Sequence, residues 1–353
     1  MKRFLPDRFT ILLVLTVVLA SVLPIRGQPA GWFKIATDIA IGLLFFLHGA
    51  RLSRDVVIAG ILHWRLHLVI LLTTFAVFPL LGLAIGFIPQ SILPASLYAG
   101  ILFLCALPST IQSSIAFTSI AEGNVPAAIC AASGSNIIGM FLTPLLAGFL
   151  LSSQADAGFS MSVLESILLQ LLAPFVLGQL LQPLIGKWIR ARKKLLTPVD
   201  RGSILMVVYL AFSNAVMEGL WHTLSVADFA VLIVIDSALL AVVLCLTMYG
   251  SRALGFSKED EITITFCGSK KSLASGIPMA NAIFANQPSS IGAIVLPLMF
   301  FHQIQLMACA VIAQKYANRL HESDAKAAVS NAGDASRPDA ESPMRKEMSA
   351  ARR

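Results

Sequence analysis

Charged residues are scarce in this 353-residue chain: they make up 13% of it, whereas 57% of its residues are hydrophobic. A soluble globular protein carries about 25% charged residues. The shortage therefore excludes a typical soluble enzyme, a nucleic-acid-binding protein and a disordered chain. A polytopic membrane protein with one helical domain remains. The apolar runs are continuous over about 20 residues, which disfavours a transmembrane β-barrel, whose strands alternate over about 10.

The five cysteines lack the paired spacing of a disulfide framework or a metal site. None forms a CxxC pair, and all five lie inside apolar runs. We interpret them as buried free thiols and predict no metal site. They are Cys105, Cys130, Cys245, Cys267 and Cys309.

Apolar runs that suit a membrane-spanning helix occur ten times, since a span needs about 20 residues at about 1.5 Å each. Ten spans divide into two halves of five, at about residues 9–151 and 163–314. An odd number per half requires the second half to be inverted relative to the first. The sequence thus predicts an all-α transmembrane domain over residues 1–320 with an inverted five-plus-five repeat. The ten predicted spans are Phe9–Leu23, Ile35–Ala50, Leu66–Ile88, Ala95–Ile120, Val125–Leu151, Val163–Ile185, Ser203–Val216, Phe229–Tyr249, Ile262–Ala285 and Ile291–Gln314.

The basic residues support this count by their distribution between the two sides. With the N-terminus in the cytoplasm, the predicted inner loops and the termini hold all but four of the 26 lysines and arginines. The outer loops hold only Arg26 and Lys34. Positive charge in short loops marks the cytoplasmic side, so both termini are predicted to be cytoplasmic. The net charge of +7 therefore indicates contact with a lipid bilayer and not with nucleic acid.

The two ends of the chain need an interpretation of their own. The basic start Met1-Lys2-Arg3 and the short first apolar run are also compatible with a cleaved signal peptide, although the apolar stretch continues to Leu23. At the other end, residues 321–353 are rich in alanine, serine and charged side chains and have no apolar periodicity. We predict a disordered cytoplasmic tail there.

The fourth span of each half is interrupted by residues that weaken a helix. Pro108 removes a backbone donor from span four, and five of the next six residues are polar. Span nine carries Gly268, Gly276 and Pro278. Broken helices at equivalent positions of two halves are the best sequence indication of a transporter's binding site.

Lys270 and Lys271 are expected near the middle of the bilayer. They follow Glu261, at the cytoplasmic end of span nine, by 9 and 10 residues, which is roughly 15 Å of helix. A lysine at that depth costs about 2.5–3.5 kcal/mol. We expect a hydrated site between the broken helices, where a lysine meets an anion or replaces a cation; the alternative is a tilted span whose lysines reach a wet surface. The predicted substrate-binding residues are Gln112, Ser113, Ser114, Ser269, Lys270, Lys271 and Ser272.

Other polar residues inside the spans are candidates for the same cavity. Asp236 is the deepest acidic residue, and it either pairs with a lysine or lines the cavity alone. Ser133 and Asn136 in span five and Thr74 in span three either take part in coupling or form hydrogen bonds between helices.

Two long stretches resemble the bile acid:sodium symporter family, in the branch of bacterial symporters related to member seven of solute carrier family 10. They are LPSTIQSSIAFTSIAEGN at residues 107–124 and FCGSKKSLA at residues 266–274. The resemblance covers about residues 5–320. It implies that discontinuous helices four and nine cross, that two helices of each repeat form a panel and the others a core, and that substrate binds between panel and core.

The chain departs from that family where the bile acid branch holds sodium. A Ser-Asn pair there corresponds to Ser113-Ser114, a Glu and a Gln correspond to Phe266 and Lys270, and a Gln of helix three corresponds to Thr74. Sodium prefers oxygen ligands, and lysine offers only donors. The hypothesis is that Lys270 supplies the positive charge that sodium supplies elsewhere. Coupling is then to protons through a desolvated lysine, or absent, and no other cofactor is expected.

These observations predict a secondary transporter or facilitator of a small organic anion, working by alternating access in a bacterial inner membrane. A non-transporting receptor or regulator built on a transporter fold is the alternative. A third reading is an intramembrane hydrolase that uses Ser269 or Ser272 with a neighbouring lysine, but the sequence shows no third group to orient such a dyad.

Overall fold

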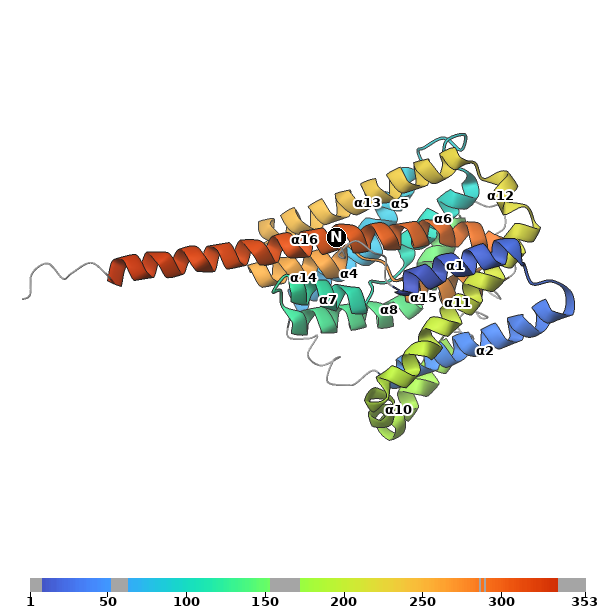
Figure 1. The fold of residues 1–353 in the computed structure, drawn as a ribbon, viewed down its shortest axis with the longest axis horizontal. Coiled ribbons are helices and arrows are strands. Elements are labelled where there is room, and N and C mark those ends of the chain that lie inside the picture. Colours follow the sequence, from blue (N-terminus) through green and yellow to red (C-terminus); the bar gives the residue numbers. More distant parts are fainter. Residues whose placement is uncertain (1–7, 52–62, 153–171, 286, 289, 336–353) are drawn as a thin grey trace, which may run out of the picture.

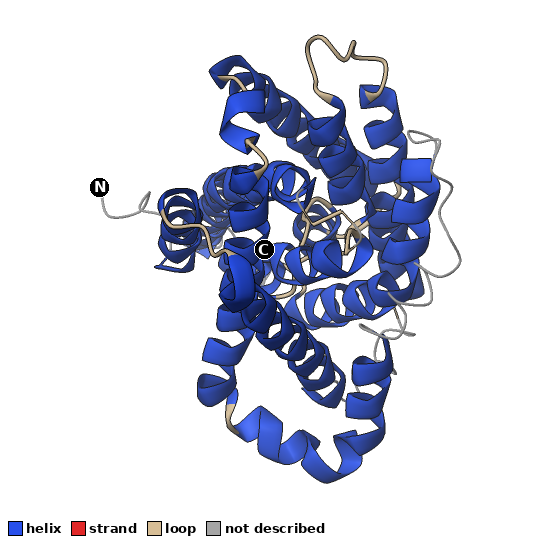
Figure 2. Ribbon diagram, turned by 90° about the vertical axis from the view of Figure 1, so that its right-hand side faces the viewer, coloured by secondary structure: helices blue, strands red, loops and turns tan. Residues whose placement is uncertain are grey.

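The computed structural model describes residues 8–51, 63–152, 172–285, 287–288 and 290–335. Within these ranges the regular structure is entirely helical (Figure 2). The elements are α1 (Arg8–Val22), α2 (Gly27–Arg51), α4 (Trp64–Leu72), the π-helix η2 (Thr73–Val77), α5 (Phe78–Ile85), α6 (Ala95–Ala106), α7 (Gln112–Ile120), α8 (Val125–Ser152), α10 (Ala173–Ala191), α11 (Lys193–Met217), α12 (Leu220–Thr223), α13 (Val226–Ala253), α14 (Lys258–Gly268), α15 (Leu273–Ile283) and α16 (Ser290–Ala335).

Each of the ten predicted spans overlaps a described helix or a pair of helices. The predicted sixth span begins at Val163, outside the described residues, and its helix α10 is described from Ala173. The part of the chain that the structure describes is therefore all-helical, and its apolar helices are those of a multi-pass membrane protein. The described helices that are long and apolar enough to cross a membrane are Gly27–Arg51, Trp64–Ile85, Val125–Leu151, Val226–Ala253 and Ser290–Arg319, with shorter apolar helices at Ile11–Val22, Ala95–Ala106 and Arg201–Met217.

The helices form two groups (Figure 1). In the peripheral group, which we define as α1, α2, α10 and α11, α2 packs against α10 and α11, and α1 packs against α11. Helices α2 and α10 approach closely because a glycine of each faces the backbone of the other: a methyl group at Gly49 would collide with the Phe175 carbonyl, and one at Gly178 with the Phe46 carbonyl. The central group consists of α4 to α8 with η2, and α13 to α16. Helix α11 contacts α15 and α16 and so connects the two groups.

The predicted interruption of span four is present. Helix α6 ends at Ala106, and Leu107 is extended (φ −73°, ψ 153°). A residue before proline is driven away from the helical region, so Pro108 explains the break. The helix resumes as α7 at Gln112.

Span nine is interrupted as well, at Gly268, one of the three residues predicted to weaken it. Helix α14 ends at Gly268, and α15 begins at Leu273, where the Ser272 hydroxyl caps the helix by accepting from the Ser275 backbone N–H. Gly276 and Pro278, predicted as breaks, instead lie inside α15. Gly276 serves close packing, because a methyl group there would collide with the side chains of Leu107 and Leu298.

The last helix is longer than predicted. Helix α16 continues to Ala335, so residues 321–335, expected to be disordered, are helical (Figure 1). Alanine, lysine and glutamate favour a helix even where no apolar face is buried, and this stretch is rich in alanine. Residues 336–353 of the predicted tail lie outside the described residues.

Candidate functional site

The two helix breaks contact each other inside the central group. We call residues 107–111 and 269–272 together the crossing. The Ser272 backbone N–H donates to the Pro108 carbonyl at 2.9 Å. The Ser109 hydroxyl donates to the Cys267 carbonyl at 2.6 Å. Segments more than 150 residues apart are therefore held together through the polar groups that the breaks expose.

Hydroxyl groups satisfy the end of α14. The last carbonyls of a helix have no partner within it and need donors from elsewhere when they are buried. The Ser269 hydroxyl donates to Thr265 O at 2.6 Å, and the Ser114 hydroxyl donates to Phe266 O at 3.0 Å. With the bond from Ser109 to Cys267 O, neutral donors serve three consecutive carbonyls. This explains why serines cluster in both predicted interruptions.

A lysine satisfies the end of α6. The Lys271 ammonium donates to the carbonyls of Cys105 at 2.8 Å and Leu107 at 2.7 Å. The Thr143 hydroxyl of α8 donates to the carbonyl between them, that of Ala106, at 2.9 Å. The Lys271 side chain is 0% exposed. The C-terminal end of a helix carries partial negative charge, which favours an ammonium at this position.

The π-helix η2 supplies a third carbonyl to Lys271. Thr74 O accepts from the ammonium at 2.8 Å, and the ring of Phe78 lies 4.0 Å from it. A π-turn shifts the helical hydrogen-bond register, and such turns are frequent at functional sites. The Thr74 hydroxyl donates to Ile70 O of its own helix. Thr74 therefore contributes its backbone and not the side chain for which it was singled out.

Lys270 has different surroundings. Its ammonium donates to Ser113 O at 2.8 Å and lies 4.0 Å from the centre of the Phe117 ring and 5.4 Å from that of Phe266. The side chain is 0% exposed, like that of Lys271. Carbonyls and aromatic rings therefore contact both ammonium groups, and neither lysine reaches the protein surface in this conformation, whereas the sequence predicted a hydrated gap. On the adjoining turn, Ser113 is half-buried and Gln112 is exposed.

Asn136 of α8 connects both breaks. Its Nδ2 donates to Ser109 O at 2.6 Å, and its Oδ1 accepts from the Ser275 hydroxyl at 2.8 Å. The neighbouring Ser135 hydroxyl accepts from the Ser109 backbone N–H at 3.1 Å. Ser133, proposed with Asn136, is half-buried on the same helix. The interhelical role of Asn136 is therefore present in this conformation.

Gln305 and Thr143 contribute to the site although the sequence prediction did not select them. The Gln305 side chain accepts from the Lys271 backbone N–H and donates to Lys271 O, both at 3.0 Å. It thereby holds the peptide groups on either side of this non-helical residue. A glutamine inside the apolar span ten was a sequence signal that could have identified Gln305. A threonine such as Thr143 is too common in membrane helices to be such a signal.

Asp236 is fully buried on α13, and neither of its carboxyl oxygens has a hydrogen-bond partner within the described residues. The predicted pair with a lysine is not formed, because both ammonium groups bind backbone carbonyls. The Ser/Lys dyad is also absent from the described crossing. The Ser269 hydroxyl donates to Thr265 O, and that of Ser272 to the Ser275 hydroxyl.

A cavity of about 540 Å³ lies between the peripheral and central groups. It is lined by residues of α2, α11, α15 and the start of α16, among them Lys34, Asp38, Asn214 and Asn281. Lys34 and Asp38 form an ion pair at 2.7 Å, and Asn281 Nδ2 lies 3.4 Å from Asp38 Oδ1. This cavity is separate from the two buried ammonium groups.

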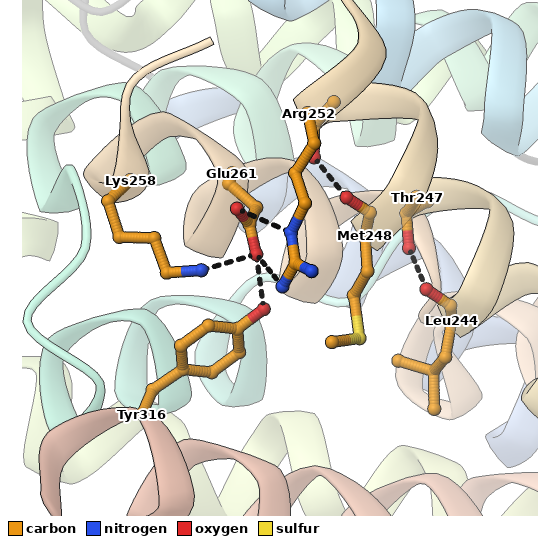
Figure 3. A network of polar contacts seen from close by, with 8 residues as sticks. Leu244, Thr247, Met248, Arg252, Lys258, Glu261 and Tyr316 are labelled. Atoms are coloured by element: carbon orange, nitrogen blue, oxygen red, sulfur yellow. Dashed lines mark hydrogen bonds and ion pairs between the residues drawn. The ribbon is translucent and has the colours of Figure 1, made fainter. Parts of the chain in front are cut away.

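A cluster of polar contacts joins three central helices at the end of α14 remote from the crossing (Figure 3). Glu261 accepts two hydrogen bonds from Arg252 at 2.9 and 3.0 Å, one from Lys258 at 2.7 Å and one from the Tyr316 hydroxyl at 2.7 Å. The Glu261 side chain is almost wholly buried. The cluster connects α13, α14 and α16 and anchors the first half of the broken helix.

Comparison with known proteins identifies a family that matches this chain. The SBF-like CPA transporter family matches residues 7–318. An uncharacterized protein of Pseudomonas aeruginosa is 56% identical over 94% of this chain and 98% of its own length. The protein named "Putative symporter YfeH" of Escherichia coli is 50% identical over 92% of this chain and 98% of its own. Sodium/bile acid cotransporter 7-B of Xenopus laevis is 28% identical over 88% and 92%.

Proposed function

Because the chain belongs to the SBF-like CPA transporter family, we propose that it is a secondary transporter of a small organic anion that works by alternating access around spans four and nine. The observation that carries the proposal is the contact between the two helix breaks, with Ser272 N bound to Pro108 O at 2.9 Å. Interrupted helices place unpaired backbone groups and helix ends at the centre of a transporter, where a solute binds. The alternative of a non-transporting receptor or regulator is not favoured, since two of the relatives are named as a symporter and a cotransporter.

The proposed architecture is ten spans in two inverted repeats. The peripheral group contains the helices of the first two predicted spans of each half, which is the composition that the resemblance gives for a panel. The central group then corresponds to the core. The cavity between α2, α11 and α15 supports relative movement of the two groups, because it lies at their boundary. The distribution of lysine and arginine supports a bacterial inner membrane with both termini in the cytoplasm.

Lys270 is the residue that we propose meets the anion. Its partner Ser113 lies in the first turn of α7, whose N-terminus carries partial positive charge. The Ser113 hydroxyl has no hydrogen-bond partner within the described residues, so it is available to a solute. The neighbouring hydroxyls of Ser114, Ser269 and Ser272 would line the site when the crossing opens and their present partners separate.

We do not assign sodium as the coupling ion. Phe266, Lys270 and Thr74 stand where the resemblance expects sodium ligands, and the ammonium groups occupy the carbonyls nearby. Coupling to protons or uncoupled, facilitated transport are the two outcomes that we propose to distinguish.

Counterflow in proteoliposomes tests the proposal. A thermal-shift screen of organic anions, with and without sodium and across pH, first identifies a solute that stabilises the folded protein. Lys270→Met should abolish counterflow of that solute and its stabilising effect while the variant stays folded. Lys258→Met is the matched control, because Lys258 binds Glu261 far from the crossing and its loss should leave counterflow intact. Unchanged counterflow in the Lys270 variant, or solute binding without exchange by the wild type, would contradict the proposal.

A further inference from the structure

The surroundings of Lys271 are those of a cation site. Three backbone carbonyl oxygens, from Cys105, Leu107 and Thr74, lie within 2.7–2.8 Å of one nitrogen, and a fourth side is closed by the Phe78 ring at 4.0 Å. We call these four groups the carbonyl cage. It comes from two separate segments of the chain: the end of α6 with Leu107, and the π-helix η2 with the start of α5.

At the end of α6 the cage oxygens have no competing donor from the helix backbone. Continuing the α6 ladder would bring the Ser109 N–H to Cys105 O, but that N–H donates to the Ser135 hydroxyl instead. Pro108 ends the ladder and has no N–H of its own. The carbonyls at the end of α6 therefore need a positively polarised partner from outside the helix.

The ammonium enters this cage without an acidic partner. No ion pair within the described residues includes Lys271, and Asp236 makes no hydrogen bond to it. Carbonyl dipoles, the negative end of α6 and an aromatic face thus stabilise the positive charge, as they stabilise a bound monovalent cation in other membrane proteins.

We propose that Lys271 fills a monovalent-cation site of this fold with its own ammonium group, and that removing the side chain leaves a site for a free cation of similar size. The crossing thus has a permanent, covalently tethered cation, so the native protein needs none from solution at this position. The inference concerns the resting structure and does not depend on which solute is transported.

The neighbouring lysine provides a matched control for the test. Lys270 is equally buried and lies one residue away, but its ammonium contacts a single carbonyl, that of Ser113, together with two rings. Removing the Lys270 side chain should not leave a site for a free cation, because one carbonyl oxygen is too few to replace the hydration shell of the cation.

The test is thermal unfolding of purified wild-type, Lys271→Ala, Lys271→Met and Lys270→Ala protein in ammonium, potassium, sodium or choline chloride at equal ionic strength. Lys271→Ala should gain a saturable rise in Tm of a few degrees in at least one of the three small cations relative to choline. Wild type, Lys270→Ala and Lys271→Met should show no such rise in Tm. In wild type and Lys270→Ala the Lys271 ammonium still occupies the carbonyl cage, and in Lys271→Met the methionine side chain fills it.

Two results obtained with folded protein would overturn the inference. One is a folded Lys271→Ala protein whose Tm is the same in all four salts. The other is an equal response of Lys271→Ala and Lys270→Ala, which would indicate a general salt effect. If Lys271→Ala unfolds when it is extracted into choline, extraction into the small cations should restore a monodisperse protein, and equal loss in every salt also counts against the site. This test does not depend on counterflow, so failure of the transport proposal would not change its interpretation.

Discussion

The ends of α6 and α14 meet at the same crossing, but different chemistry satisfies them. Three serine hydroxyls, from Ser109, Ser114 and Ser269, cover the last carbonyls of α14. A buried ammonium, with help from Thr143, covers those of α6. The two interrupted spans therefore solve the same problem once with neutral donors and once with a charge. The charged solution is the one that can be replaced by an ion, and the neutral one cannot.

Removing the charged cap should have the largest effect. Lys271→Met replaces three hydrogen bonds with none and leaves three buried carbonyls without a donor, so we expect a loss of about 3 kcal/mol in unfolding free energy. Denaturant unfolding in detergent measures it, with Lys258→Met as the reference for loss of a partly exposed lysine. A loss below about 1 kcal/mol would mean that the π-helix and α6 rearrange to satisfy each other.

Removing the residue that serves both breaks should have the next largest effect. Asn136→Ala deletes the bonds to Ser109 O and to the Ser275 hydroxyl, and we expect a loss of about 1.5 kcal/mol. Asn136→Leu is the second variant, because its larger side chain does not leave the space for water that alanine leaves. Both variants should lose a similar amount of unfolding free energy. If only Ala is destabilised, the cavity and not the hydrogen bonds accounts for the loss.

The neutral cap should be weaker than the charged one. The double variant Ser109→Ala, Ser114→Ala removes two hydroxyl donors from the end of α14, with an expected loss of about 1 kcal/mol, since side-chain hydrogen bonds between membrane helices average about 0.6 kcal/mol. The same unfolding measurement gives its ratio to Lys271→Met. Equal losses would remove the distinction between the two helix ends.

The smallest effect is expected at the cavity between the two groups. Lys34→Met breaks the pair with Asp38, whose two side chains are 56% and 31% exposed, and an exposed ion pair contributes about 0–1 kcal/mol. We expect less than about 0.5 kcal/mol, and a smaller change at high salt. A loss as large as that of Lys271→Met would show that exposure is no guide to the strength of charge contacts in this protein.

Local rules were enough to locate the breaks approximately. Pro108 and the following polar run predicted the end of α6 because a proline restricts the residue before it, and α6 does end at Ala106. The same reasoning failed for Gly276 and Pro278, which lie inside α15. A glycine in a sequence marks either a flexible backbone or a close contact, and the collision that a side chain would make with Leu107 identifies the second at Gly276.

The partners of the lysines were beyond sequence reasoning. Depth alone indicated that Lys270 and Lys271 need compensation, since an ammonium in the bilayer core is costly. Water, an anion and Asp236 were the expected partners, whereas the structure provides backbone carbonyls. Every residue carries a carbonyl, so no residue type signals one that is free. The carbonyls that bind Lys271 are exposed by the π-turn at Thr73–Val77 and by the break after Ala106.

The sequence by itself determined that this chain is a helical membrane protein with two broken helices and two buried lysines, because hydropathy and proline act within a few residues of the chain. The tertiary structure alone decided that the two lysines differ, one beside a single carbonyl and two rings, the other inside a carbonyl cage. That difference depends on segments brought together from α5, α6, α7 and η2, whose contacts with Lys270 and Lys271 have no counterpart in local sequence.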